Sequence, residues 1–104
     1  MPTTTTLHHT LTDLINRTRH HPACAHIRHA HTITTQNLPA DGPPNNSLTY
    51  RYNSDSAPRH ALAAAYLVHK LTHRHAQNLP QYADLGHAEA HLLTAATLLA
   101  THPN

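Results

Sequence analysis

Leucine and isoleucine recur at helical spacing near the start of the chain. Leu7, Leu11 and Leu14 fall on one face of a helix over about residues 5–19, with polar residues on the other faces. Pro22 follows closely, and proline disfavours the helical conformation for the residue before it. The pattern therefore predicts an amphipathic helix that ends shortly before Pro22.

Two further helices are predicted in the second half of the chain. The first starts at a cap-like cluster at 54–58 and continues through alanine-rich sequence to about residue 76, and the second covers about residues 81–101. The most apolar stripe of the first consists of Ala61, Ala64, Leu67, Val68 and Leu71. The corresponding stripe of the second consists of Leu85, Ala88, Leu92, Ala95, Ala96 and Leu99. Each helix is thus expected to bury one side.

Between the first helix and these two, the apolar period changes to two. Residues 24–36 place Ile27 and Ile33 on one face and are rich in threonine, which predicts a strand. A proline- and asparagine-rich loop at 37–46 separates it from a second predicted strand at 47–53. We therefore expect an α+β fold with a β-hairpin followed by two Ala/Leu-rich helices, in the order α-β-β-α-α.

Length and composition favour one small domain. The chain has 104 residues, 38% of them hydrophobic, with no Phe or Trp, so one thin core is expected, with short flexible ends at about 1–4 and 102–104. A formal charge of +2 is too small to keep the chain expanded. The single cysteine, the lack of a secretory leader and the lack of a long apolar run predict a cytoplasmic protein without a membrane span.

The last two predicted helices carry more apolar surface than their stripes can bury. The surplus residues are Leu62, Tyr66, Leu93 and Leu98. A chain of this length has little other material to cover them, so they are expected to contact another protein, most simply a second copy in a homodimer. The sequence thus predicts a small, non-enzymatic protein that acts through protein–protein contact.

Nucleic-acid binding is an alternative. Arginine suits phosphate and tyrosine can stack on unpaired bases. The residues that offer these groups are Arg17, Arg19, Arg28, Tyr50, Arg51 and Tyr52. Tyr50 and Tyr52 are also the largest residues available for a core, which weighs against this interpretation.

Histidine suggests a second alternative, a transition-metal site. The 14 histidines accompany abundant threonine, asparagine and proline, the mixture that a coding strand rich in C and A produces, so only histidine spacing is informative. The pairs His69/His73 and His87/His91 each span four residues, and helical residues four apart share a face. Two such pairs on adjacent helices could hold zinc or nickel. Otherwise no cofactor is expected.

Catalysis receives little support from the sequence. Glu89 follows His87 by two residues, whereas the zinc-protease pattern places glutamate directly after the first histidine. Cys24 and His26 could form a nucleophile and base, but no third orienting group or recognisable motif accompanies them. The many histidines do predict acid lability between about pH 7 and 5, because any histidine buried in its neutral form resists protonation.

Overall fold

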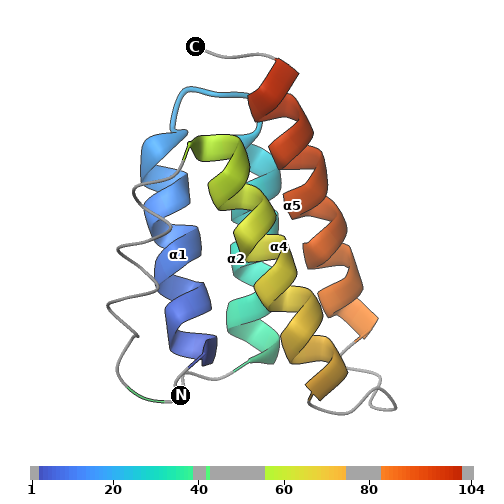
Figure 1. Ribbon diagram of the computed structural model, residues 1–104. Coiled ribbons are helices and arrows are strands. Elements are labelled where there is room, and N and C mark those ends of the chain that lie inside the picture. The colour runs from blue at the N-terminus through green and yellow to red at the C-terminus, as the bar shows by residue number, and fades with distance from the viewer. Residues whose placement is uncertain (1–2, 39–41, 43–55, 75–82, 102–104) are drawn as a thin grey trace.

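The computed structural model describes residues 3–38, 42, 56–74 and 83–101 (Figure 1). These residues form the helices α1 Thr3–Arg17, α2 Cys24–Asn37, α4 Ala57–Arg74 and α5 Ala83–Thr101. No strand occurs among the described residues. The predicted α+β fold is therefore wrong, and the molecule is a helical bundle. The predicted second strand, 47–53, lies outside the described residues.

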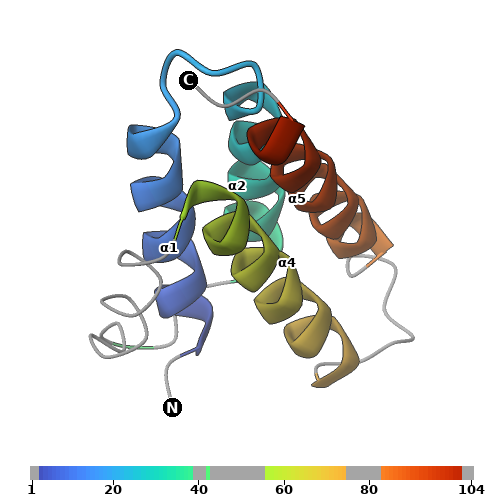
Figure 2. The same ribbon diagram turned by 45° about the horizontal axis from the view of Figure 1, so that its top comes forward.

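Each helix packs against two neighbours in a ring. α1 contacts α2, α2 contacts α5, α5 contacts α4, and α4 contacts α1. Figures 1 and 2 show that neighbouring helices run in opposite directions. The end of α2 and the start of α4 lie at opposite ends of the bundle.

The helices predicted from apolar spacing are present with nearly the expected bounds. In α5 the buried residues are Leu85, Ala88, Leu92, Ala95, Ala96 and Leu99, the stripe expected from the sequence. The predicted stripe of α4 is also buried throughout. In α1, Leu7, Leu11 and Leu14 are fully buried. The period of 3.6 therefore identified both the elements and their core-facing sides.

The predicted first strand is instead the helix α2. Its buried residues follow a helical period and are Cys24, Ile27, Ala30 and Thr34. A larger apolar residue in place of Ala30 or Thr34 would make this helical period easier to detect in the sequence. Thr34 and Thr35 donate their hydroxyls to the carbonyl of His31 at 3.0 and 2.9 Å. Such bonds to the preceding turn accommodate threonine in a helix, so its preference for strands is overridden here.

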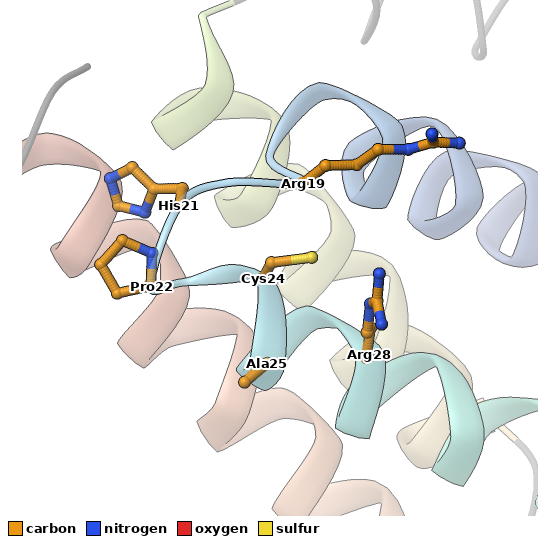
Figure 3. Close-up of a pocket in the computed structure, with 6 residues that line it drawn as sticks. All are labelled: Arg19, His21, Pro22, Cys24, Ala25 and Arg28. Carbon is orange, nitrogen blue, oxygen red and sulfur yellow. The ribbon is translucent and has the colours of Figure 1, made fainter.

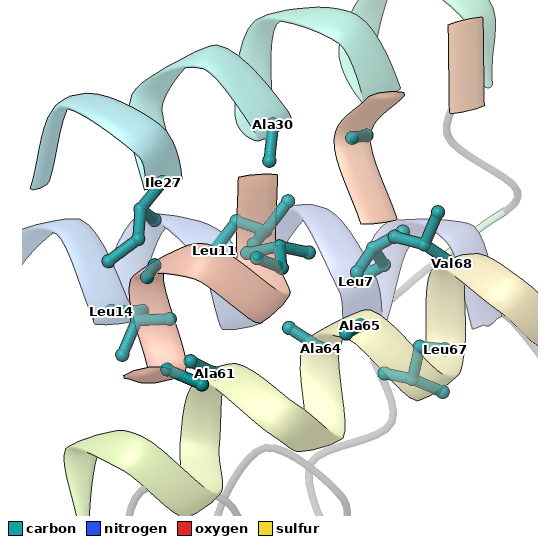
Figure 4. Packing of buried hydrophobic residues seen from close by; sticks show 14 of the residues in the cluster. Leu7, Leu11, Leu14, Ile27, Ala30, Ala61, Ala64, Ala65, Leu67 and Val68 are labelled. Atoms are coloured by element: carbon teal, nitrogen blue, oxygen red, sulfur yellow. The ribbon is translucent and has the colours of Figure 1, made fainter. Parts of the chain in front are cut away.

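The core is built from leucine and alanine at the centre of the ring. Figure 4 shows Leu7, Leu11 and Leu14 of α1 facing Ala61 and Ala64 of α4. Alanine at these contacts lets the helix backbones approach closely, and leucine fills the remaining space. A chain without Phe or Trp can therefore still close a continuous core.

A short turn between α1 and α2 sets the position of the second helix. Thr18 donates its hydroxyl to the Leu14 carbonyl at 2.8 Å, and the backbone N–H of His21 donates to the Thr18 carbonyl at 2.9 Å. The buried ring of His21 accepts the N–H of Ala23 through Nδ1 at 3.0 Å. These bonds fix the direction in which α2 leaves the turn, and with it the face of α2 that meets α5.

Candidate functional site

Exposed apolar side chains concentrate on α4 and α5. Among the described residues, the large hydrophobic side chains that remain exposed are Leu62 at 50%, Tyr66 at 61% and Leu93 at 44%. Leu62 and Tyr66 lie four residues apart, opposite the buried stripe of α4. They share the outer side of that helix because residues four apart share a face.

An ion pair between the two helices fixes where Leu93 lies relative to Tyr66. Nδ1 of His69 on α4 is 3.1 Å from Oε1 of Glu89 on α5. Because the two helices are antiparallel, one turn back from His69 on α4 is level with one turn forward from Glu89 on α5. These positions hold Tyr66 and Leu93. We define the α4/α5 face as Leu62, Tyr66 and Leu93.

Leu98, the fourth residue expected at this surface, lies elsewhere. It is partly buried and packs against the core. Leu98 is two helical turns beyond His91, which contacts α2. Leu98 therefore faces the side of α5 toward α2, not the side that carries Leu93.

The two helices that carry the α4/α5 face differ in charge. α4 carries Arg59, Lys70 and Arg74 and no acidic residue, whereas α5 carries Asp84 and Glu89 and no lysine or arginine. Lys70 Nζ lies 6.0 Å from the centre of the Tyr66 ring, a distance at which a cation is attracted to an aromatic face. Lys70 therefore lies beside Tyr66, whereas Glu89 lies between the two helices, where it pairs with His69.

A group of histidines joins α2 to α5 on a different side of α5. Nδ1 of His26 lies 3.0 Å from Nδ1 of His91, with ring centres 5.3 Å apart. The His29 ring stacks on His91 with a centre-to-centre distance of 5.1 Å. His87 lies one turn before His91 on α5 and is close enough to influence its charge. We call His26, His29, His87 and His91 the α2/α5 histidine cluster.

The pKa of His91 reflects this crowding. Burial is the main cause that lowers it, followed by the proximity of His26, His29 and His87, whose positive charges would repel an imidazolium. His91 is thus held toward its neutral form, in which a ring nitrogen can accept a proton or a metal ion. Burial also lowers the pKa of His31 on the same helix α2.

The four histidines predicted to form one metal site are divided between two places. His69 and His73 lie together on α4 with ring centres 4.3 Å apart, and His69 pairs with Glu89. His91 instead contacts α2. Among the residues that the structure describes, no group of three or more His, Cys, Asp or Glu side chains is arranged to hold a metal ion.

Sequence reasoning missed His26 and His29 as partners of His91 because it placed them on a strand. On a strand, residues three apart point to opposite faces. On the helix α2, the same two residues share a face. The signal that could have found them is the helical spacing of Cys24, Ile27, Ala30 and Thr34.

The residues proposed for nucleic-acid contact are only partly described. Tyr50, Arg51 and Tyr52 lie outside the described residues. Arg17 is engaged with the buried ring of His60, with 2.9 Å between the guanidinium and Nδ1. Arg19 and Arg28 line one shallow pocket beside the start of α2.

That pocket contains the single cysteine (Figure 3). Cys24 is 5% exposed and lies in the first turn of α2. Arg19 and Arg28, which line the same pocket, precede and follow it in the sequence. Arg19 also donates to Oδ1 of Asn16 at 3.0 Å. A thiol buried to this extent is poorly placed to attack a substrate in solution.

None of the described helices combines the length and the apolar character that a membrane span needs. Comparison with protein-family models, with curated proteins and with solved structures finds no match for this chain.

Proposed function

We propose that this protein is a small, non-enzymatic binding module of the cytoplasm that pairs with a second copy of itself through the α4/α5 face. The observation that carries the proposal is the exposure of Leu62, Tyr66 and Leu93 on two helices that pack side by side. Exposed apolar side chains that form one patch are typical of protein-binding surfaces, whereas scattered ones are not.

The charges beside the patch favour a second copy as the occupant. In a two-fold dimer the same surface meets itself, so every contact occurs twice. If α4 of one copy lies across α5 of the other, basic Lys70 approaches acidic Glu89 of its partner on both sides of the axis. If α4 instead lies across α4, Arg59 and Lys70 face like charges. The first arrangement is therefore the one that we propose.

The chemistry of the patch is suited to such a contact. Tyrosine is enriched at the centres of protein interfaces because its ring buries a large area while its hydroxyl keeps a polar partner. Burial of Tyr66 against Leu93 of the partner would remove both from water. Three partly exposed apolar side chains per copy form a small surface, so we expect a reversible dimer that depends on concentration.

Sedimentation velocity over a range of concentrations tests the proposal. The wild type is expected to shift from monomer to dimer as concentration rises, and Tyr66→Gln and Leu93→Gln are expected to remain monomeric at concentrations where the wild type is paired. The matched control is Thr32→Gln, which changes an exposed position on α2 and should dimerise like the wild type. Equal dimerisation by all four proteins would exclude the α4/α5 face as the contact.

A monomeric wild type would give a different conclusion. The patch would then be left for a different protein or for no partner, and self-association would be withdrawn. Circular dichroism of each variant separates loss of pairing from loss of folding, because both substituted side chains are exposed in the monomer and their replacement is not expected to unfold it.

A further inference from the structure

The pocket beside the start of α2 has no role in the proposed dimer contact, because it is formed by α2 and by the turn that precedes it. Its volume is about 330 Å³, near the lower end of the range for ligand pockets, so it suits a small group. Its lining includes two arginines, Arg19 from the turn and Arg28 from α2. Positive charge from two separate segments of the chain is thus brought to one hollow of the surface.

Both guanidinium groups have N–H groups to spare. Arg28 is exposed, and within the described part of the chain it has no hydrogen bond or ion pair. Arg19 donates to Oδ1 of Asn16 at 3.0 Å through one nitrogen, Nη2. A guanidinium carries several further donors in one plane and no acceptor. Both side chains can therefore donate to an additional acceptor at the pocket.

The described acidic side chains lie elsewhere and do not neutralise this charge. Asp13 is one turn before Arg17 on α1, and Arg17 contacts α4, so Asp13 lies on the side of α1 toward α4. Glu89 pairs with a histidine of α4. Asp84 is in the first turn of α5, at the opposite end of the bundle from the start of α2. None of these carboxylates lines the pocket.

The first turn of α2 adds donors of its own. Its N–H groups point out of the helix start, where the helix dipole is positive, and its N-cap residue is Ala23, whose methyl side chain cannot cap them. Figure 3 shows the sulfur of Cys24 pointing to the side of the turn on which both guanidinium groups lie. This buried thiol, a weak donor, has no hydrogen-bond partner among the described residues. Donors of three kinds therefore meet at the pocket.

We propose that this pocket binds a phosphate group, held between Arg19 and Arg28 at the start of α2. A guanidinium presents parallel N–H groups that match two phosphate oxygens, and the positive end of a helix favours the same anion. Both side chains are exposed, so they can turn toward a shared anion through ordinary staggered conformers. The pocket is shallow, so it admits the free ion or a phosphate whose organic part stays in solvent.

Titration with inorganic phosphate, followed by ¹H–¹⁵N NMR, tests the site. At about pH 7.5 histidine is mostly neutral, so the arginines supply the charge, and NaCl keeps the ionic strength at about 0.15 M throughout. We expect saturable shifts in the Nε–H signals of Arg19 and Arg28 and in the backbone N–H of Ala25. The Nε–H signal of Arg59 on α4 should stay unchanged.

Three matched variants show whether binding depends on the pocket or on charge alone. Arg19→Gln and Arg28→Gln should each weaken phosphate binding by about tenfold or more, because each removes charged hydrogen bonds to the anion. Arg59→Gln removes the same charge from an exposed position on α4 and should change the affinity by less than about twofold. All three side chains are exposed, so the variants should keep the helical circular dichroism of the wild type.

A second probe, phenyl phosphate, distinguishes the two sources of the group. Tighter binding of the ester indicates a phosphorylated molecule as the ligand, tighter binding of the inorganic ion indicates free phosphate, and either result supports the site. Shifts that grow without saturation, or equal weakening in all three variants, would mean an adventitious ion only and would overturn the proposal. The absence of shifts at Arg19 and Arg28 with both probes would overturn it as well.

Discussion

His26 on α2 and His91 on α5 place their Nδ1 atoms 3.0 Å apart, although 65 positions separate them in the chain. One ring donates a proton and the other accepts it, so the contact requires at least one neutral imidazole. Protonation of both rings would turn two N–H groups toward each other. The packing of α2 on α5 is therefore sensitive to pH at this point.

The first prediction concerns stability at mildly acidic pH. The folded pKa values of His91 and His31 are lowered from the ordinary 6.5, so the unfolded chain takes up these protons first as pH falls. Stability should be fully present above about pH 6.5 and should decline below it. The measurement is the melting temperature with a chelator present at pH 7.5 and pH 5.5, chosen as about one unit to either side of that value.

The variant His91→Gln identifies the source of the decline. It removes the titrating ring from the cluster, so the difference in melting temperature between the two pH values should be smaller than in the wild type. Equal melting temperatures of the wild type at both pH values would contradict the prediction.

A second prediction concerns the contact between Arg17 and His60. His60 is fully buried, and its Nδ1 accepts from the Arg17 guanidinium at 2.9 Å. Arg17→Leu removes this charged donor and should lower the free energy of unfolding by about 1–2 kcal/mol. Arg19→Leu, which removes an exposed contact to Asn16, should change it by less than about 0.5 kcal/mol. Urea unfolding measures the free energy of unfolding of both variants. Equal losses in Arg17→Leu and Arg19→Leu would show that the contact of Arg17 with His60 does not stabilise the fold.

A third prediction tests the helical conformation of α2 with one substitution at two alanines. Ala30 is fully buried, whereas Ala25 in the first turn of the same helix is exposed. Ala30→Glu places a carboxylate in the core and should cost at least about 3 kcal/mol of stability. Ala25→Glu should be neutral or slightly stabilising, since an acidic residue suits the start of a helix. A strand at 24–36 would give the reverse contrast, because Ala25 would share the face of Ile27 and Ala30 would lie on the opposite face. A greater loss of stability in Ala25→Glu than in Ala30→Glu would therefore contradict α2.

A fourth prediction concerns the charges proposed to meet across the dimer. Lys70→Glu and Glu89→Lys should each weaken the dimer, by about fivefold at low salt, because each places like charges opposite one another twice. The double variant Lys70→Glu/Glu89→Lys restores opposite charges and should recover much of the affinity. Dimer dissociation constants from sedimentation equilibrium provide the comparison. Additive weakening in the double variant would show that Lys70 and Glu89 do not meet.

The sequence predicted the helices that have leucine at several core positions, and failed in α2, which has no leucine among its buried residues. Leu85, Leu92 and Leu99 identified the buried side of α5. In α2, Ala30 and Thr34 carry little hydrophobic signal, and the alternation around Ile27 and Ile33 imitated a strand. The difference arises because tertiary packing, not local preference, decides the conformation of a weakly patterned segment.

The candidate surfaces show the same division. Leu62, Tyr66 and Leu93 could be predicted as exposed because they fall outside well-defined stripes on helices that the pattern identified. Leu98 could not, because its burial depends on α2, which was assigned to a strand. The contacts of His91 with His26 and His29 required both the helical form of α2 and its place beside α5, and neither follows from spacing along the chain.

Native mass spectrometry of the wild-type protein as a function of concentration tests self-association most directly. The proposed pairing through Leu62, Tyr66 and Leu93 predicts a dimer whose share of the signal rises with concentration and falls in Tyr66→Gln. A wild-type protein that stays monomeric at every concentration would contradict it.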